Sequence, residues 1–449
     1  MTRATVERDW AQPVVLADER PVARTRSGDL TRADLLRRAQ ALAARLPDAP
    51  AALNLCEHRE HYLAALLALE LRGQVCLMPP SRAAAVLDDV QAAHPGSVRI
   101  DDAMVEAALP SVSRGPVSSL VLDGARVVAI GYTSGSTGQP KANPKTWRSF
   151  AGPAACNARE LRSQIDAGEQ TVPWLVATVP SQHMYGMECT AILPLLEGVA
   201  IHSSHALFPA DVAAALAEVP APRVLVSTPV HLRALLESGI TLPPLAAVVS
   251  ATAPLSAELA AQVESRLTTR VLEFFGSTET CVIASRRTAT GSAWMPYPGL
   301  SFARAGDGMQ VSAPWLDAPV PMLDVFEPAA GGGFHVVGRS ADMIDVAGKR
   351  TSLTDLTRRL LAVPGVRDAV IVQPADAAGG AVRRLVAFVV SDGPSAAGIA
   401  DALSGQVDPV FIPRPIVCVE RLPRNEVGKL PRDELLRLVR EHALDGPAR

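Results

Sequence analysis

GYTSGSTGQPK, at residues 131–141, is the segment from which the fold and chemistry of this chain are best inferred. It follows the short apolar run 126–130, which predicts a buried strand. The loop supplies four hydroxyl groups, and its glycines let the backbone approach a ligand closely. Hydroxyls, backbone N–H groups and the terminal Lys141 are the donors that a polyphosphate needs. A serine- and glycine-rich surface turn is the open alternative.

The loop differs from a Walker A motif, in which a Gly-Lys-Ser/Thr sequence runs directly into a helix. Here Pro140 precedes the lysine, and Asn143-Pro144 prevents a helix from starting at once. These residues argue against a P-loop phosphotransferase or ATPase, which would release phosphate rather than pyrophosphate.

TSGSTGQPK resembles the phosphate-loop signature of the adenylate-forming superfamily, which includes acyl- and aryl-CoA ligases, nonribosomal-peptide adenylation domains and luciferases. The resemblance implies that this loop binds the phosphates of ATP. The residues concerned are Thr133, Ser134, Gly135, Ser136, Thr137, Gly138 and Lys141.

The composition is that of a soluble globular protein with two or three domains. The chain has 449 residues, of which 48% are hydrophobic and 20% charged. A net charge of −3 gives no support for a nucleic-acid partner, and no apolar run is long enough for a membrane span. The N-terminus lacks the apolar segment of a signal peptide, and the six cysteines show no metal-binding spacing. We therefore expect a cytoplasmic protein, monomeric or homodimeric.

Helices alternating with short apolar strands predict an α/β fold. We expect a large N-terminal domain, residues 1–338, with mixed and parallel sheets flanked by helices and a small β-rich part after about residue 295. Residues 339–342 are interpreted as a hinge, and residues 343–449 as a small, mobile α+β lid domain. The hinge prediction rests on Gly338-Arg339, which resembles the segment that joins the two domains in the superfamily.

A second motif, FFGSTET at residues 274–280, follows a predicted strand. It resembles the superfamily's aromatic-Gly-x-Thr-Glu signature, which implies that Phe275 lies against adenine and Thr278 reaches the α-phosphate. Glu279 then offers a hard oxygen to Mg²⁺. Gly276 and Ser277 complete this ATP-binding turn. The alternative is a capped helix start with Glu279 in its first turn.

Four other segments also resemble superfamily motifs. Residues 250–255, SATAPL, correspond to an adenine loop, in which the usual two glycines are replaced; its nucleotide contacts are Thr252, Ala253 and Pro254. The alternative is the first turn of the following helix. Asp324 is expected at the ribose hydroxyls, and Arg339 at the ribose or phosphate. Lys429, in the turn PRNEVGKLPR at 423–432, is expected to be catalytic, together with Thr278 and Glu279.

The segment PSQHMYG at residues 180–186 resembles the part of the superfamily that borders the acyl pocket. The motif alignment implies a pocket with several small side chains, which favours a short aromatic acid over a long acyl chain. Its predicted residues are His183, Tyr185, Ser227, Ala251 and Cys281.

These motifs together predict an ATP- and Mg²⁺-dependent, AMP-forming carboxylate ligase. It would activate a small, hydroxybenzoate-like acid and transfer it to the pantetheine thiol of CoA or of an acyl carrier protein. The compact size also resembles the ligases of aryl-polyene (xanthomonadin-type) pathways, which load a carrier protein. A medium- or long-chain fatty acyl ligase and a non-catalytic nucleotide sensor are the alternatives.

Overall fold

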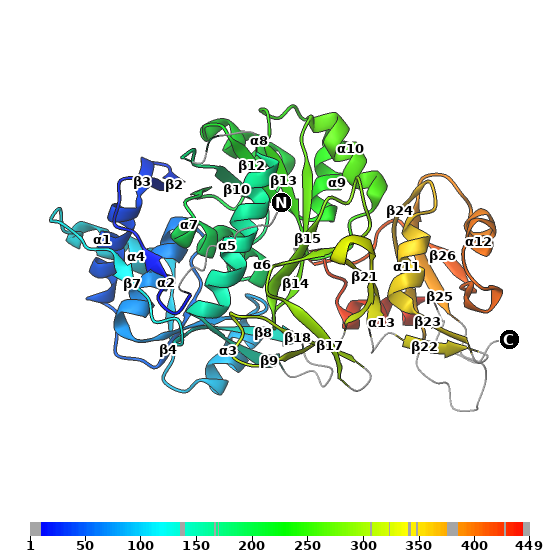
Figure 1. Cartoon of the computed structure of the whole chain (residues 1–449), viewed down its shortest axis with the longest axis horizontal. Helices are drawn as coiled ribbons and strands as arrows, with labels where there is room; N and C mark the ends of the chain where they lie inside the picture. Colours follow the sequence, from blue (N-terminus) through cyan, green and yellow to red (C-terminus); the bar gives the residue numbers. More distant parts are fainter. Residues whose placement is uncertain are drawn as a thin grey trace.

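The computed structural model describes residues 10–134, 140–165, 168, 170–305, 308–322, 324–339, 343–346, 349–374, 385–425 and 428–442. In Figure 1 the large N-terminal region, blue to green, occupies the left and centre, and the small C-terminal region, yellow to red, lies on the right. The predicted α/β class is confirmed.

A nine-stranded sheet forms the centre of the large region. Its strand order is β16–β15–β14–β13–β12–β10–β11–β2–β3, and the six strands from β14 to β2 run parallel. The strands are β2 (Pro21–Thr25), β3 (Gly28–Thr31), β10 (Trp174–Ala177), β11 (Ala200–His202), β12 (Arg223–Ser227), β13 (Ala247–Ser250), β14 (Val271–Ser277), β15 (Cys281–Arg286) and β16 (Met295–Pro296).

A second, five-stranded sheet has the order β6–β4–β5–β8–β9. Its strands are β4 (Ala51–Asn54), β5 (Val75–Met78), β6 (Val98–Ile100), β8 (Val127–Ser134) and β9 (Pro140–Thr146). Only the β8–β9 pair is antiparallel, and the segment between these two strands is the predicted phosphate loop. A separate short pair joins β1 (Val14–Val15) to β7 (Leu120–Val121).

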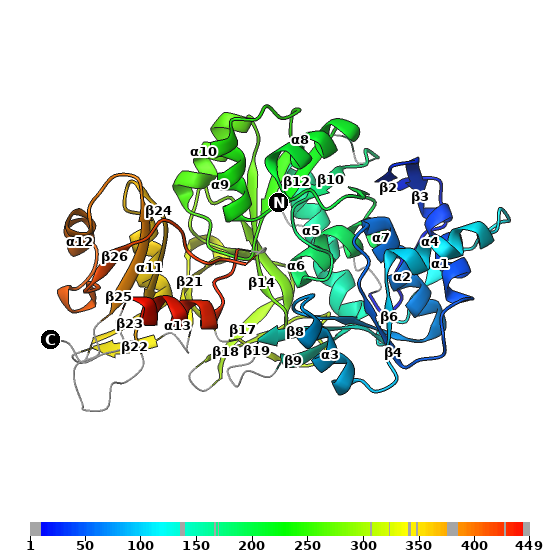
Figure 2. The same cartoon turned by 180° about the vertical axis from the view of Figure 1, so that it is seen from behind.

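Helices cover both sheets (Figures 1 and 2). They are α1 (Arg32–Ala43), α2 (Arg59–Arg72), α3 (Ala84–Ala93), α4 (Asp102–Ala108), η1 (Leu109–Ser111), α5 (Trp147–Gln164), α6 (Met184–Met187), the π-helical turn η2 (Glu188–Ile192), α7 (Leu193–Leu196), α8 (Pro209–Glu218), α9 (Pro229–Ser238) and α10 (Ala257–Leu267). Helix α5 begins only after β9, as Asn143-Pro144 predicted.

Alternating side chains of the nine-stranded sheet face two different cores. Val224 and Val226 of β12 belong to a large apolar cluster that joins both sheets and includes Trp147. Leu225, between them, faces a second cluster formed with α8, α9 and α10. Burial on both faces explains why these strands are apolar runs rather than alternating sequences.

The chain becomes β-rich after residue 295, as predicted. This part contains β17 (Ser301–Ala305), β18 (Gly308–Ser312), β19 (Val320–Met322), β20 (Asp324–Pro328), η3 (Ala330–Gly332) and β21 (Phe334–Arg339). Its core is aromatic, with Phe326 and Phe334 separated by 4.7 Å between ring centroids.

The C-terminal region has a core of its own, which includes Leu356, Leu360 and Val389. Its elements are β22 (Met343–Val346), β23 (Lys349–Ser352), α11 (Leu353–Leu361), β24 (Val366–Val372), β25 (Val386–Ser391), α12 (Ala396–Ser404), η5 (Pro409–Phe411), β26 (Ile416–Cys418) and α13 (Arg432–Glu441). The predicted hinge falls between β21 and β22, and its residues 340–342 lie outside the described part. The domain boundaries at 338 and 343 stay predictions.

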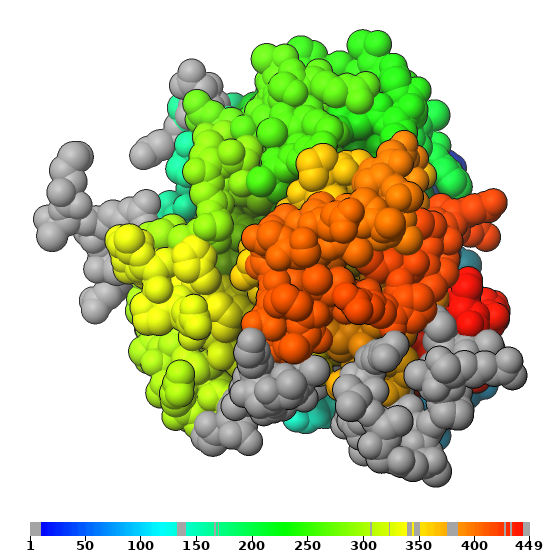
Figure 3. Space-filling view, turned by 90° about the vertical axis from the view of Figure 1, so that its right-hand side faces the viewer, coloured from blue at the N-terminus to red at the C-terminus, as the bar shows by residue number. Residues whose placement is uncertain are grey.

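The small region is seated against the large one (Figure 3). Arg367 at the start of β24 lies 3.7 Å from Glu237 of α9, measured between Nη1 and Oε1. Within the described residues, no helix has the length and apolarity needed to cross a bilayer.

Candidate active site

The carboxyl ends of four neighbouring parallel strands carry hydroxyl side chains. Ser227, Ser250 and Ser277 are the last residues of β12, β13 and β14, and Thr178 directly follows β10. Ligands of open α/β sheets bind at this edge. The predicted motifs at 180–186, 250–255 and 274–280 therefore all leave the sheet on the side where a ligand is expected.

The phosphate-loop segment joins the two strands of an antiparallel hairpin. Thr133 pairs with Lys141, and Ser134 pairs with Pro140, in the register of β8 and β9. Lys141 is exposed at the start of β9. Of the predicted phosphate ligands, Gly135, Ser136, Thr137 and Gly138 lie outside the described residues, and only the backbone of Thr133 and Ser134 is described.

Gly131 brings the first two motifs into contact. A methyl group at this glycine would lie 2.9 Å from Met184 Cε and 3.1 Å from Thr278 Cγ2. Both distances are shorter than ordinary van der Waals contact. The strand that leads into the phosphate loop therefore packs directly against the Thr278–Glu279 turn, and a side chain at Gly131 would require Met184 and Thr278 to shift.

The second motif is a tight turn between two antiparallel strands. Ser277 and Thr280 hold it, because the Thr280 backbone N–H donates to Ser277 Oγ at 3.2 Å and the Ser277 N–H donates to Thr280 Oγ1 at 3.2 Å. Cys281 follows with φ = 59° and starts β15. The alternative in which Glu279 begins a helix is wrong, since a strand follows the turn.

Two buried charged residues that belong to none of the predicted sites flank this turn. The ammonium of Lys145, on β9, donates a hydrogen bond to the backbone carbonyl of Glu279. Glu188, in the π-helical turn, accepts a hydrogen bond from the Val282 N–H at 3.0 Å. Burial raises the pKa of Glu188 to about 7, while the Val282 N–H and the Lys145 charge favour its ionised form.

The predicted adenine loop is irregular rather than helical. Residues 251–255 contain no helix, and α10 begins at Ala257 with Ser256 as its N-cap. Thr252 has φ = 79°, a left-handed conformation that is costly for a β-branched residue. This backbone explains why the related motif uses glycine here. Ala253 is half-buried and Pro254 is exposed.

The loop is fastened to the sheet by Glu273 of β14. Its Oε1 accepts a hydrogen bond from the Leu255 N–H at 3.2 Å, and its Oε2 accepts one from Arg286 Nε at 2.7 Å. Burial raises the pKa of Glu273, and the charge of Arg286 opposes that shift. Nothing in the sequence motif pointed to this residue.

The structure places Tyr185, Ser227, Ala251 and Cys281 among the buried residues. The Tyr185 hydroxyl donates to the Val249 carbonyl at 3.0 Å, so it can accept but not donate a hydrogen bond to a ligand. The Ser227 hydroxyl lies 3.0 Å from Thr178 Oγ1. Burial raises the pKa of the Cys281 thiol, which keeps it protonated and unreactive.

The turn that carries Lys429 lies against the large region. A methyl group at Gly428, where φ = 77°, would lie 3.3 Å from Val230 Cγ2, at the start of α9. Burial, together with the charge of Lys429, lowers the pKa of His183 to about 4. Lys429 is therefore close enough to His183 to affect it electrostatically, although 246 positions separate them along the chain.

Two more residues that are predicted to bind the nucleotide lie opposite each other on the β20–β21 hairpin. Asp324 and Arg339 are direct partners in its antiparallel register. Phe275 packs beside Trp294, with ring centroids 5.1 Å apart, in the aromatic core of the β-rich part. The proposed roles of Asp324 and Arg339 at ribose and of Phe275 at adenine stay predictions.

Glu279 and its surroundings fit a magnesium ion that is held mainly by nucleotide phosphates. Its side chain is half-buried beside the phosphate-loop hairpin and offers hard oxygen ligands. The described residues contain no group of three acidic, histidine or cysteine side chains that could hold a metal ion by themselves. A single carboxylate is what a Mg²⁺ ion shared with a triphosphate requires.

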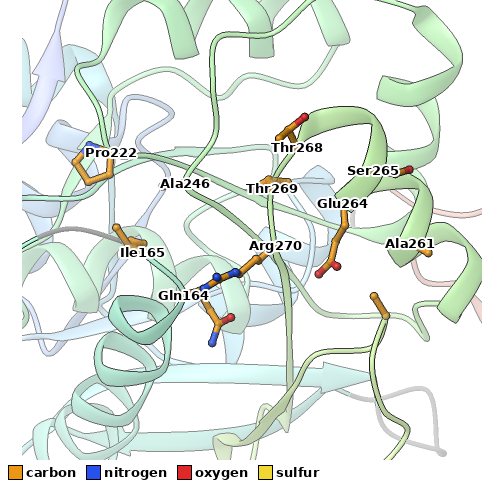
Figure 4. Close-up of a pocket in the computed structure, with 11 residues that line it drawn as sticks. Gln164, Ile165, Pro222, Ala246, Ala261, Glu264, Ser265, Thr268, Thr269 and Arg270 are labelled. Atoms are coloured by element: carbon orange, nitrogen blue, oxygen red, sulfur yellow. The ribbon is translucent and has the colours of Figure 1, made fainter.

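A groove of about 790 Å³ lies elsewhere on the large region (Figure 4). Pro222, Ala246 and Arg270 line it, and each directly precedes a parallel strand. The groove is therefore at the amino ends of β12, β13 and β14, opposite the edge that carries the motifs. None of the predicted site residues lines it.

Comparison with known proteins agrees with this geometry. Residues 38–306 match the model of the AMP-binding enzyme family, and residues 358–429 match that of the AMP-binding enzyme C-terminal domain. The chain belongs to the AMP-binding enzyme family. It is an AMP-forming acid–thiol ligase, and the predicted superfamily is confirmed.

Three similar proteins illustrate the relationship. A 4-coumarate–CoA ligase of Rhodobacter capsulatus is 32% identical over 282 residues, which cover 62% of this chain and 67% of the relative. A 4-coumarate–CoA ligase of Halorhodospira halophila is 27% identical over 361 residues, covering 74% and 83%. The o-succinylbenzoate CoA synthetase of Bacillus subtilis, solved with its acyl-adenylate, has the same fold, with a TM-score of 0.75 at 20% identity over 93% and 95% of the two chains.

Proposed function

We propose that this ligase activates a small aromatic carboxylic acid with ATP and transfers the acyl group to a pantetheine thiol. The first step joins the carboxylate oxygen to the α-phosphorus of ATP and releases pyrophosphate. In the second step the thiol sulfur attacks the acyl carbon, and AMP leaves. The acceptor is CoA or the phosphopantetheine arm of a carrier protein.

The observation that supports this proposal best is the convergence of three distant segments at one edge of the sheet. Gly131 packs against Thr278, and the Lys429 charge acts on His183. The β8–β9 hairpin, the Thr278–Glu279 turn and the turn that carries Lys429 thus lie near the same edge of the sheet. A nucleotide sensor would need the first two but has no use for a lysine delivered from another domain.

The residues of the proposed site act in two ways: they stabilise charge, and they position the substrates. Lys141 and the hydroxyl loop hold the β- and γ-phosphates, and the Glu279 carboxylate holds Mg²⁺, which offsets the phosphate charge. Lys429 bridges the attacking carboxylate and the α-phosphate, while Asp324 and Arg339 hold the ribose. Stabilising charge as it develops in the transition state typically contributes most of the catalysis in such a site.

The side chains predicted to line the acyl pocket favour an aromatic substrate. Tyr185 supplies an aromatic ring, while Ala251 and Cys281 are small. The relatives described above act on 4-coumarate and o-succinylbenzoate, according to their names. A fatty acid would need a long apolar tunnel at this place.

ATP–pyrophosphate exchange, measured over benzoates, cinnamates and fatty acids, tests the proposal. We expect exchange with a hydroxybenzoate or cinnamate and little with octanoate or longer acids. Faster exchange with octanoate than with every aromatic acid would overturn the substrate assignment. ATP binding without exchange for any acid would favour the nucleotide sensor. Thiol transfer to CoA and to a phosphopantetheinylated carrier protein then identifies the acceptor.

A further inference from the structure

Lysine is rare in this chain. Only four of its 43 lysine and arginine residues are lysines, at positions 141, 145, 349 and 429. Lysine and arginine are not interchangeable where the size and geometry of the cation matter. Two of the four, Lys141 and Lys429, already have roles in the proposed function. Lys145 has none, and it lies four residues from Lys141 on the same strand, β9.

Lys145 is also buried, with 3% of its surface exposed. A buried lysine is uncommon, because taking an ammonium out of water is costly unless it is paired. Its pairing here is specific: Nζ donates to the backbone carbonyl of Glu279, and its charge acts on the buried carboxylate of Glu188. These two interactions offset the free-energy cost of burying the Lys145 ammonium, and the hydrogen bond is made to the Thr278–Glu279 turn.

That turn is anchored on both sides by buried groups from other elements. Lys145 of β9 holds the carbonyl of Glu279, and Glu188 of the π-helical turn holds the N–H of Val282 at 3.0 Å. Between these anchors lies Cys281, whose φ of 59° is unfavourable without outside support. Gly276 approaches from the other side, where a methyl group would lie 2.1 Å from the Cys281 carbonyl oxygen.

We propose that Lys145 is a positioning residue for adenylation: its buried ammonium holds the Thr278–Glu279 turn in the conformation that presents Thr278 and Glu279 to MgATP. This inference rests on the proposed function for its chemical consequence. A guanidinium would not be an equivalent replacement for the ammonium here, because it is a larger, planar group with several donors, and the buried site offers one carbonyl.

Hydrogen exchange of the nucleotide-free protein tests the positioning directly. Lys145→Met keeps the length of the side chain and removes its donor, while Lys145→Gln keeps a neutral donor. We expect amides of residues 277–283 to exchange at least about tenfold faster in Lys145→Met, with Lys145→Gln in between, because a hydrogen bond to a charged group contributes that much. Arg148→Met is the matched control, since Arg148 is only partly buried and forms a surface ion pair with Asp317. Unchanged exchange in both Lys145 variants would overturn the proposal.

A double-mutant cycle tests the chemical consequence. Lys145→Met should reduce pyrophosphate exchange at least about tenfold and raise the Mg²⁺ concentration needed for half-maximal rate, while transfer from supplied acyl-adenylate changes less than about threefold. If Lys145 acts through Glu279, the double variant with Glu279→Gln should be little worse than Glu279→Gln alone. Multiplicative losses, or an equal loss in both half-reactions, would overturn the proposal. A wild-type enzyme without pyrophosphate exchange would instead refute the proposed function, and hydrogen exchange would still test the role of Lys145.

Discussion

Arg424 forms a two-pronged ion pair with Asp368, its Nε and Nη2 each donating to one carboxylate oxygen at 2.7 Å. The remaining nitrogen, Nη1, donates to the carbonyl of Gly428 at 2.9 Å. Asp368 lies on β24 of the small region. Arg424 therefore connects the sheet of that region to Gly428, the residue next to Lys429. A planar fork with fixed donors is well suited to this task. Arg424 thereby orients the turn that carries the proposed catalytic lysine.

Replacing either partner should loosen this turn. Asp368→Asn and Arg424→Ala are each expected to lower pyrophosphate exchange about tenfold, because a hydrogen bond between charged groups contributes roughly 1.5–3 kcal/mol. Transfer from supplied acyl-adenylate should change much less, since Lys429 is not needed for that step. Arg421→Ala, an exposed arginine three residues before Arg424, is the control and should behave as wild type. Equal losses in both half-reactions would show that these residues matter only for folding.

Lys429→Ala should abolish most adenylation. One charge-stabilising group typically supplies about 10²–10³ in rate, and loss of positioning adds to this. The same variant should raise the pKa of His183 from its depressed value, because one of the two causes of that depression is removed. Histidine resonances followed by NMR during a pH titration would report this change in the free enzyme. Unchanged titration of His183 would mean that Lys429 lies elsewhere in solution.

Gly276→Ala should be severely destabilising. A methyl group at Gly276 would lie 2.1 Å from the carbonyl oxygen of Cys281, which is backbone and cannot move without disturbing the turn. We expect a loss of several kcal/mol in the free energy of unfolding, because a clash with backbone cannot be relieved by moving a side chain. Gly291→Ala is a matched control, since a methyl group there meets nothing within 4 Å. Urea unfolding of both variants would decide, and equal stabilities would contradict the close approach of Gly276 to the Cys281 carbonyl.

His231 should make the protein less stable in mild acid. Burial, together with the nearby His205, lowers its pKa to about 4 from an ordinary value of 6.5. The unfolded chain therefore binds a proton more readily between these two values, so stability falls as the pH drops through this window. The expected loss between pH 7 and pH 5 is about 2 kcal/mol.

The measurement is urea unfolding of wild type, His231→Gln and His442→Gln at both pH values. His231→Gln should remove this part of the pH dependence, whereas His442, exposed at the end of α13, should not matter. An identical pH dependence in wild type and His231→Gln would show that His231 is not held neutral by its surroundings.

Local sequence was sufficient for much of the architecture. Thr31, a hydroxyl residue directly before an amphipathic run, caps α1, its Oγ1 accepting from the Asp34 N–H at 3.1 Å. Asn143-Pro144 delays α5, and the apolar runs became buried parallel strands, because both effects depend on a few neighbouring residues. Local sequence did not decide the conformation at Glu279, since a Thr-Glu sequence suits a helix start as well as a strand-to-strand turn. The strand pairing of Cys281 with Ser277 decided it.

The sequence by itself determined the class of fold, the order of the motifs and the type of chemistry, because each motif is a short run of residues with its own local geometry. Only the tertiary structure decided which distant groups meet. It placed Lys145 on the Glu279 carbonyl, Glu188 on Val282, and Arg424 between Asp368 and Gly428. Most of these contacts join residues that are tens of positions or more apart in the sequence. The contact between Arg424 and Gly428 depends instead on a local turn. Buried charges of this kind leave no periodic pattern in the sequence, and their partners are known only once the chain has folded.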